Sequence, residues 1–336
     1  FGDPYDIGIQ LDSAYKPKKD IVITLTILAI FIIGFVSQYI FLDTDKSIIS
    51  ALITIPLGFL VFLAAYYFDY SLINKYFKYI YIIYIIALFS IIFLSNLGGY
   101  VLGIFSRING KISNINYLFM LFPVLYSCII HKMHNKGFLG IIICGISIIP
   151  AILLSLFIPS LSMVIFVSVI GLVILTYSIF KNWFNKNKLA DMLIIYIPTI
   201  FFIIITYLNN YYIRTRLNSV INPYQDITGA GYVPYTIRNI VSHCKFIGKG
   251  TGNLNLQAIV PELDTNFILT NLMYSYGIIV LVILIFLISI VLYRGFKIIS
   301  QQKNMLGEFT GISIVSIYAF HTVSNILSNL GFALFY

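Results

Sequence analysis

Long apolar runs separated by short polar segments dominate this chain. Nine runs reach the roughly 17–25 residues that an α-helix needs to cross a bilayer, and they are rich in Ile, Leu and Phe. They cover residues 21–42, 48–68, 76–95, 115–131, 139–157, 160–180, 190–208, 267–293 and 306–330. Because a segment in lipid must satisfy its own backbone hydrogen bonds, each run predicts a helix. The pattern therefore predicts an all-α polytopic membrane protein with nine transmembrane helices.

One long polar segment, residues 209–266, separates the seventh run from the eighth. The whole chain is 60% hydrophobic and only 10% charged, whereas a soluble domain carries about a quarter charged residues. Against that background this loop is rich in ionisable residues, which include Arg214, Arg216, Asp226, Arg238, Lys245, Lys249, Glu262 and Asp264. We therefore expect the chemistry of the protein to lie in this loop.

The Lys and Arg residues of the short connecting segments predict the orientation. If the N-terminus is cytoplasmic, 13 of the 21 Lys and Arg fall in cytoplasmic segments and three in short outer segments. Lys and Arg accumulate in short cytoplasmic loops, so the N-terminus is predicted inside and the 209–266 loop outside. The net charge of +9 then reflects membrane orientation, and no nucleic-acid-binding surface is predicted.

We expect one membrane domain, residues 21–336, after a cytoplasmic segment, residues 1–20. The chain opens on Phe1 and stops at Tyr336 directly after an apolar run, which predicts that it is cut at both ends. Residues 1–20 would then be the end of a longer prefix domain. The three cysteines and four histidines lack the spacing of a metal site or a disulfide framework, so no metal ligand is predicted.

Five short blocks of the outer loop occur in a characteristic order: RTRL (214–217), NP (222–223), GAGY (229–232), GKG (248–250) and PELDTNFI (261–268). Their order and spacing resemble the SEDS family, the FtsW-, RodA- and SpoVE-like proteins of bacterial division, elongation and sporulation. The orientation, the hairpin at Pro159 and Asn325 in the last run are also similar to that family. Family members have ten helices, so the resemblance implies a tenth helix after Tyr336.

The resemblance implies a peptidoglycan glycosyltransferase that joins lipid II units at the outer face of the bacterial cytoplasmic membrane. Such enzymes commonly act beside a class B penicillin-binding protein, in cell-wall synthesis linked to cell shape, division or sporulation. A carboxylate would take a proton from the acceptor sugar hydroxyl, while Arg and Lys would hold the lipid pyrophosphate. No cofactor is identified, and whether a divalent cation assists the pyrophosphate stays open.

The candidate site residues come from the same blocks. The substrate-binding candidates are Arg214, Arg216, Arg238, Lys249 and Asp226, and the catalytic candidates are Asp264, Glu262 and Asn266, which stands at the family's Asp position. Structural explanations compete with each of these roles. Arginines anchor helix ends at lipid headgroups, an Asp after Asn-Pro is typical of a turn, and acids favour the first turn of a helix.

Three departures separate this chain from the family's pattern. The family's candidate base is replaced by Asn266, which cannot accept a proton at neutral pH. Asp264 lies two residues earlier and would share a face with position 266 in an extended segment but not in a helix. Where the family has an acidic residue after the proline, this chain has Ser160 after Pro159. The family's acidic element near the fourth helix has no counterpart around residues 112–117.

Two other functions stay open. Asn266 favours a degenerate family member that scaffolds or regulates a partner synthase. A flippase of lipid-linked sugars is the second alternative, and it would move substrate between leaflets without making glycan chains.

Overall fold

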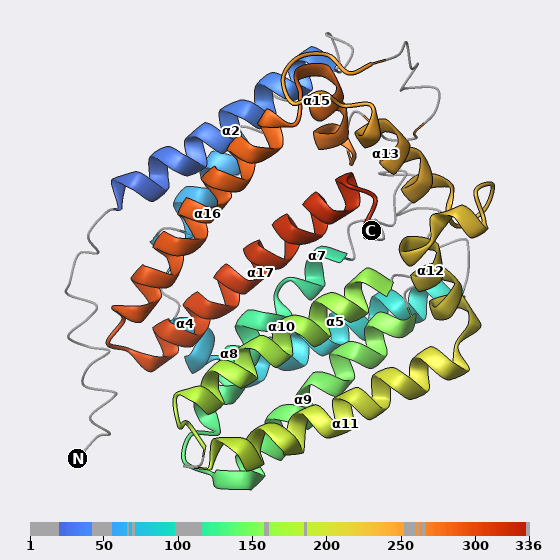
Figure 1. Cartoon of the computed structure of the whole chain (residues 1–336). Coiled ribbons are helices and arrows are strands. Elements are labelled where there is room, and N and C mark those ends of the chain that lie inside the picture. Colours follow the sequence, from blue (N-terminus) through green and yellow to red (C-terminus); the bar gives the residue numbers. More distant parts are fainter. Residues whose placement is uncertain are drawn as a thin grey trace.

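The computed structural model describes residues 20–41, 56–65, 67–68, 71–97, 116–157, 161–184, 187–251, 260, 263 and 266–333, and every regular element within them is helical (Figure 1). The elements are α2 (Ile21–Phe41), α4 (Ser71–Lys75), α5 (Phe77–Leu97), α7 (Asn116–Phe119), α8 (Phe122–Lys132), α9 (Gly137–Phe157), α10 (Leu161–Phe180), α11 (Lys188–Asn209), α12 (Tyr211–Ile221), η2 (Pro223–Gln225), α13 (Tyr232–Ser242), α15 (Ile268–Tyr276), α16 (Ile279–Ser300) and α17 (Met305–Asn329). The all-α prediction is confirmed.

Five helices of the described residues are long and apolar enough to cross a membrane: α9, α10, α11, α16 and α17. Shorter apolar helices lie at Ile21–Ser37, Pro56–Ala65 and Phe77–Phe89. The chain is therefore a multi-pass membrane protein, as its apolar runs predict. The count of nine spans stays a prediction.

Two of the predicted spans are each divided into two helices. The run at 115–131 contains α7 and α8, and Pro123 stands in the first turn of α8, where proline is tolerated because that N–H needs no intrahelical partner. The run at 267–293 is broken at Gly277, whose φ of +102° is favourable for glycine alone. A Cβ there would lie 2.7 Å from Ile247 Cα. Hydropathy missed both breaks because the residues around them are also apolar.

The 209–266 segment is not an irregular loop, because it contains α12, η2 and α13. These elements gather at one end of the helix bundle, which we call the loop end (Figure 1). The turns after α10 and α16 lie at the opposite end. Helix α12 was counted as part of the polar loop because Asn209 and Asn210 interrupt the apolar run before it.

Helix α17 is central to the packing. It contacts α8, α10, α15 and α16, while α2 packs against α16 at the edge of the bundle (Figure 1). The core between these helices is filled by large side chains with almost no exposed surface, among them Phe119, Phe122, Tyr126, Phe166 and Phe309. Such tight packing fixes α17 against α8 and α10.

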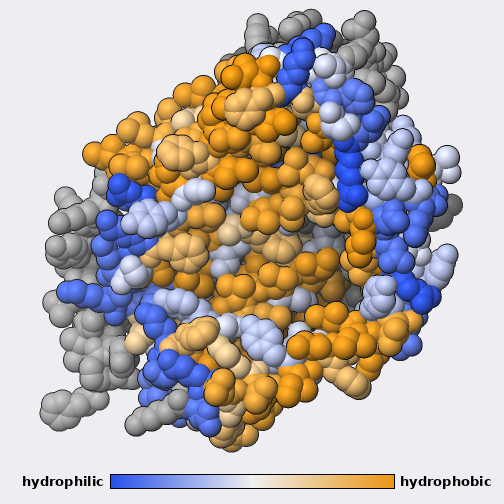
Figure 2. Space-filling model, viewed as in Figure 1, coloured by the Kyte–Doolittle hydropathy of each residue, from blue (hydrophilic) through white to orange (hydrophobic). Residues whose placement is uncertain are grey.

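An apolar band covers much of the visible face of the molecule. Figure 2 shows hydrophobic side chains between two hydrophilic margins, one over α12 and α13 and one at the opposite end. Exposed Ile, Leu and Phe side chains cover α2, α11 and α16. A surface of this extent needs an apolar environment, which a bilayer provides.

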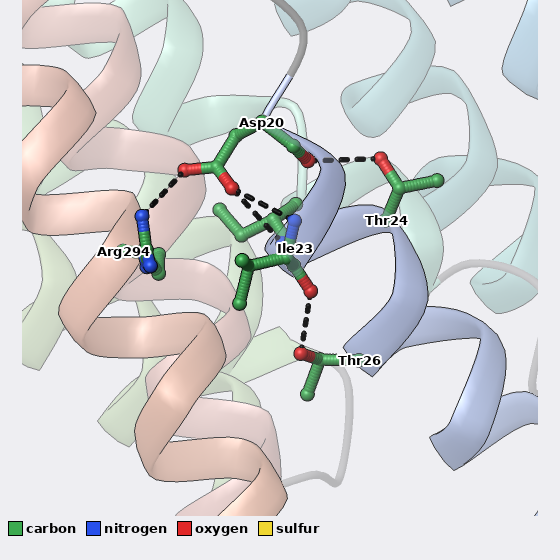
Figure 3. Close-up of polar contacts among 6 residues, drawn as sticks. Asp20, Ile23, Thr24, Thr26 and Arg294 are labelled. Carbon is green, nitrogen blue, oxygen red and sulfur yellow. Dashed lines mark hydrogen bonds and ion pairs between the residues drawn. The ribbon is translucent and has the colours of Figure 1, made fainter.

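The start of α2 is linked to the end of α16 by Asp20. One carboxylate oxygen accepts hydrogen bonds from the amides of Val22 and Ile23, at 3.0 and 3.2 Å, and so caps α2 (Figure 3). The other oxygen lies 3.4 Å from Nη1 of Arg294 on α16. A single carboxylate therefore both caps α2 and pairs the two helices.

A second ion pair joins α10 to α17 at the opposite end. Nζ of Lys181 lies 2.7 Å from Oε1 of Glu308, and the Tyr177 hydroxyl donates to the same carboxylate. The Glu308 side chain is 8% exposed and the Lys181 side chain 45% exposed. The hydrogen bond to Glu308 raises the pKa of Lys181, so the ammonium form is favoured in the folded protein.

The unequal burial of this pair predicts unequal effects of mutation. Lys181→Ala leaves a buried carboxylate without its cation and should lower the free energy of unfolding by about 1–3 kcal/mol. Glu308→Gln leaves Lys181 near solvent and keeps an acceptor for Tyr177, so its effect should be smaller. Because the pKa of Lys181 is raised, the difference is present at neutral pH and disappears as the pH rises through that raised pKa. Thermal unfolding in detergent measures both effects, and equal losses at neutral pH contradict the prediction.

Candidate functional site

The loop end contains a small folded unit with a core of its own. Helix α13 is strongly amphipathic, and its buried side chains Ile237 and Ile240 pack with Val260, Leu263, Phe267 and Tyr274. Upstream, the side chain of Asn210 accepts a hydrogen bond from the amide of Ile213 and caps α12 directly after α11. Arg214, Arg216 and Arg238 are therefore carried by the helices α12 and α13.

The predicted catalytic acids Glu262 and Asp264 lie outside the described residues. Their neighbours Val260 and Leu263 are buried in the core of the unit, at 2% and 3% exposure. Asn266 is described and half-buried, in a turn that precedes α15. Position 266 is therefore not helical.

Asp226 organises the turn between η2 and α13. Its two carboxylate oxygens accept hydrogen bonds from the amides of Gly229 and Ala230, both at 2.9 Å, and its carbonyl accepts from Gly231. These contacts match the turn role weighed for an Asp after Asn-Pro. The role of Asp226 in substrate binding stays a prediction.

The GKG block packs its backbone against the junction of α15 and α16. The amide of Gly248 donates to the carbonyl of Tyr276 at 2.9 Å, and that of Gly250 donates to the carbonyl of Tyr274 at 2.7 Å. Gly248 has a φ of +88°, which favours glycine. These two amides are already used within the protein, so they do not contribute to an anion cradle. The side chain of Lys249 between them is exposed.

Arg238 links three elements at the loop end. Its Nε donates to the carbonyl of Gly331 at 3.0 Å and its Nη2 to the carbonyl of Val220 at 2.5 Å. The guanidinium also lies 4.5 Å from the centroid of the Phe332 ring. Arg238 on α13 thus holds the end of α12 against the segment after α17. Arg has five N–H groups, so two of them occupied by these carbonyls leave others for a ligand.

Arg214 and Arg216 are exposed on α12. The Arg214 guanidinium lies 5.9 Å from the centroid of the Tyr211 ring, one turn earlier on the helix. Exposed Arg beside Tyr at the end of an apolar span is typical of the headgroup region of a bilayer. The geometry is compatible with both headgroup anchoring and binding of a lipid phosphate.

An apolar groove of about 590 Å³ runs along the bundle below α12. It is lined by α10, α12, α16, α17 and the segment after α17, and Figure 2 shows this face hollowed near its centre. The residues that form its wall at the loop end are Leu217, Val220, Ile221 and Phe332, and deeper ones include Val173, Ser316 and Phe296. Ser316 to Leu327 on α17 span about 16 Å at 1.5 Å per residue. This shape and lining suit a long hydrocarbon chain.

Arg238 is a cation at the loop end of this groove. Two of its direct contacts, Val220 and Phe332, are groove-lining residues. The loop end of the apolar groove is therefore next to the Arg238 guanidinium. The sequence did not reveal the groove, because its lining residues are ordinary apolar residues on helices far apart in the chain.

A buried polar cluster lies where α15 meets the end of α17. Asn329 and Thr270 are fully buried and hydrogen-bonded to each other, and Asn329 also donates to the carbonyl of Asn266 at 3.2 Å. Asn325 is the residue that matches the family's pattern, whereas Asn329, one turn later, was not predicted from the sequence. Two Asn residues one turn apart in an apolar helix were the signal, because polar residues within spans have bundle-facing roles.

The described residues contain no group of three or more His, Cys, Asp or Glu side chains that could hold a metal ion. Glu262 and Asp264 lie outside the described residues. The involvement of a divalent cation therefore stays open.

Known proteins are similar to this chain in sequence. Residues 19–333 match the FtsW/RodA/SpoVE family, described as cell cycle protein. Stage V sporulation protein E of Bacillus subtilis (strain 168) is 29% identical over 112 residues, 33% of this chain and 31% of that protein. A probable peptidoglycan glycosyltransferase FtsW of Lactococcus lactis is 25% identical over 185 residues, 51% of this chain and 44% of that protein. The matches span less than half the length of these curated relatives.

The fold is also similar to a solved structure. One chain of a structure on the coordination of polymerization and crosslinking by a peptidoglycan synthase complex matches with a TM-score of 0.67 at 16% sequence identity. The match covers 93% of this chain and 88% of that chain. The helical arrangement is therefore shared almost throughout, and the family match extends over nearly the same residues. The chain belongs to the FtsW/RodA/SpoVE family of cell cycle proteins.

Proposed function

We propose that this protein is a peptidoglycan glycosyltransferase that joins lipid II units at the outer face of a bacterial cytoplasmic membrane. The observation that carries the proposal is the apolar groove that passes into the cationic loop end at Arg238. A lipid-linked sugar diphosphate has the matching chemistry, with a long hydrocarbon chain joined to a dianionic headgroup. The names of the FtsW relatives, which are probable peptidoglycan glycosyltransferases, support the same reaction.

In this proposal the cations of the loop end hold the diphosphate. Arg238 lies at the groove, while Arg214, Arg216 and Lys249 are exposed at the same end of the bundle. Arg can bind phosphate oxygens in a bidentate fork, and Lys contributes a point charge. The diphosphate is the leaving group, so stabilising its charge lowers the barrier to transfer.

The base in this proposal is Asp264, with Glu262 as the second acid of the segment. A carboxylate accepts the proton of the acceptor hydroxyl as that oxygen attacks the anomeric carbon of the donor. Asn266 stands at the family's Asp position and can donate or accept a hydrogen bond but cannot take this proton.

We further propose that the N-terminus is cytoplasmic and that a class B penicillin-binding protein is the partner. The excess of Lys and Arg in the short segments at the opposite end supports this orientation. The similarity to a chain of a peptidoglycan synthase complex supports a partner synthase.

Asn266 favours a second candidate, a family member that lacks transferase activity and regulates its partner. This candidate predicts that the partner synthase needs the protein while the protein polymerises nothing itself.

The first prediction of the proposal concerns Asp264. Purified full-length protein with its partner synthase should convert lipid II to glycan chains, and Asp264→Asn should lower the rate at least 100-fold because no carboxylate remains at that position. Asp20→Asn is the control, since Asp20 caps α2 at the opposite end and Asn also caps helices. Gel analysis of labelled glycan chains measures the rate.

The outcomes of this experiment separate the candidates. Loss of polymer with Asp264→Asn alone supports the transferase. Absence of polymer from the wild-type protein, with a partner that is still stimulated, supports the regulator. Movement of lipid II between leaflets of a vesicle without any polymer supports a flippase.

The orientation predicts which engineered cysteines a membrane-impermeant maleimide reaches in intact cells. Burial raises the pKa of Cys244 and slows its reaction, so the probes are Ser242→Cys and Gln302→Cys in a Cys244→Ser background. Both positions are exposed, Ser242 at the loop end and Gln302 at the opposite end. Ser242→Cys should react in intact cells and Gln302→Cys only after lysis. The reverse result rejects the proposed site of reaction.

The groove predicts a dependence on the length of the lipid chain. Val323→Trp places a large ring in the groove and should weaken use of a long-chain lipid II about tenfold, which corresponds to about 1.4 kcal/mol. A short-chain analogue should be affected much less. Val282→Trp on α16 is the matched control, because Val282 does not line the groove and is 48% exposed against 51% for Val323. Equal effects of the two variants would contradict a chain-binding groove.

A further inference from the structure

Helix α15 begins without a capping residue of its own. Its first residue is Ile268, and Phe267 before it provides no side-chain hydrogen bond. The first amides of a helix have no intrahelical partner and need one elsewhere. For Thr270 this partner is Oδ1 of Asn329, 3.0 Å away on α17. A side chain distant in sequence thus caps the helix that follows the acidic segment.

The NH₂ group of the Asn329 side chain holds the turn before α15. Nδ2 of Asn329 lies 3.2 Å from the carbonyl oxygen of Asn266 and 3.0 Å from that of Asn325. The Thr270 hydroxyl donates to the carbonyl of Asn329 at 2.8 Å. Asn329 and Thr270 have no exposed surface, so water does not compete for these bonds.

An amide is the group that this position requires. Its oxygen accepts from the amide of Thr270 while its NH₂ group donates to the carbonyl of Asn266. A carboxylate of the same shape would keep the acceptors and lose the donors, and an apolar side chain would remove both kinds of hydrogen bond.

The end of α17 that carries Asn329 also lines the groove. Ser324 and Leu327 lie within the preceding two turns and are groove residues, and Phe332 follows three residues later. The same few turns of α17 therefore contact both the groove and the residues that begin α15. A rigid connection of this kind fixes Asn266 and the start of α15 relative to the groove.

We propose that Asn329 is a positioning residue that fixes Asn266 and the first turn of α15, which directly follow the proposed catalytic acids in the chain. The proposal rests on the glycosyltransferase function proposed above. Asn329 contacts no substrate in this account and acts through the carbonyl of Asn266 and the first turn of α15.

The test compares Asn329→Asp with Asn329→Ala in the full-length protein and its partner. Asp retains the acceptor for Thr270 but has no donor when ionised and a single O–H when protonated, in place of the two N–H groups that serve the carbonyls of Asn266 and Asn325, whereas Ala loses both acceptor and donors. With Asn329→Asp we expect kcat for lipid II polymerisation to fall at least tenfold while KM stays within about threefold, since the groove is intact. Hydrogen exchange of peptides covering residues 263–267 should become at least tenfold faster.

Ser313→Ala is the control for a merely structural effect. Ser313 is also buried on α17, and its hydroxyl donates to the carbonyl of Pro123 on α8 at 3.0 Å. Loss of this hydrogen bond should lower the melting temperature without changing kcat or the hydrogen exchange of residues 263–267. If Asn329→Ala does not fold, Thr270→Val removes the contacts of the Thr270 hydroxyl with Asn329 and keeps the amide contact, so it should accelerate exchange in the same region to a smaller extent.

Two results overturn the proposal. The first is an Asn329→Asp variant whose kcat, KM and exchange match those of Ser313→Ala. The second is unchanged exchange at residues 263–270 in both Asn329→Asp and Thr270→Val. If wild-type protein makes no glycan, the proposed function fails, and the exchange measurement still decides whether Asn329 holds this segment.

Discussion

Helix α17 makes polar contacts with other parts of the chain along its whole length. Glu308 pairs with Lys181 at one end, Ser313 bonds the carbonyl of Pro123 farther along, and Asn329 bonds Thr270 at the loop end. Helices in a bilayer gain little from burying apolar surface against one another, because lipid tails are equally apolar. Packing and a few buried hydrogen bonds therefore have to specify how the helices are arranged. Helices α8, α10, α15 and α16 pack directly against α17.

The loop end shows how this arrangement produces a site. The polar segment between α11 and α15 folds as a unit with its own small core, and Arg238 joins that unit to α12 and to the segment after α17. The groove begins at the same junction. Apolar and cationic surfaces therefore meet at one point, at the edge of the apolar band. That combination suits a substrate with a hydrocarbon chain and an anionic headgroup.

Several loop residues serve the structure as well as any ligand. Asp226 is bonded to the amides of its own turn, and the amides of Gly248 and Gly250 are bonded to α15. Lys249 is left exposed between two glycines that anchor the turn. The family's pattern of glycines and polar residues thus serves partly to fold the loop. A chain with Asn266 at the family's Asp position can keep that fold whatever its activity.

The sequence by itself determined the membrane class, the helical secondary structure and the family, because apolar run length and motif order are properties of the chain alone. It also located the polar segment that carries the candidate residues. The tertiary structure alone decided the break at Gly277, the groove and the partners of Arg238 and Asn329, which include residues 93 and 59 positions away. Hydropathy is blind to such features, since it averages neighbouring residues, whereas a hydrogen bond or a groove wall depends on which helices meet in space.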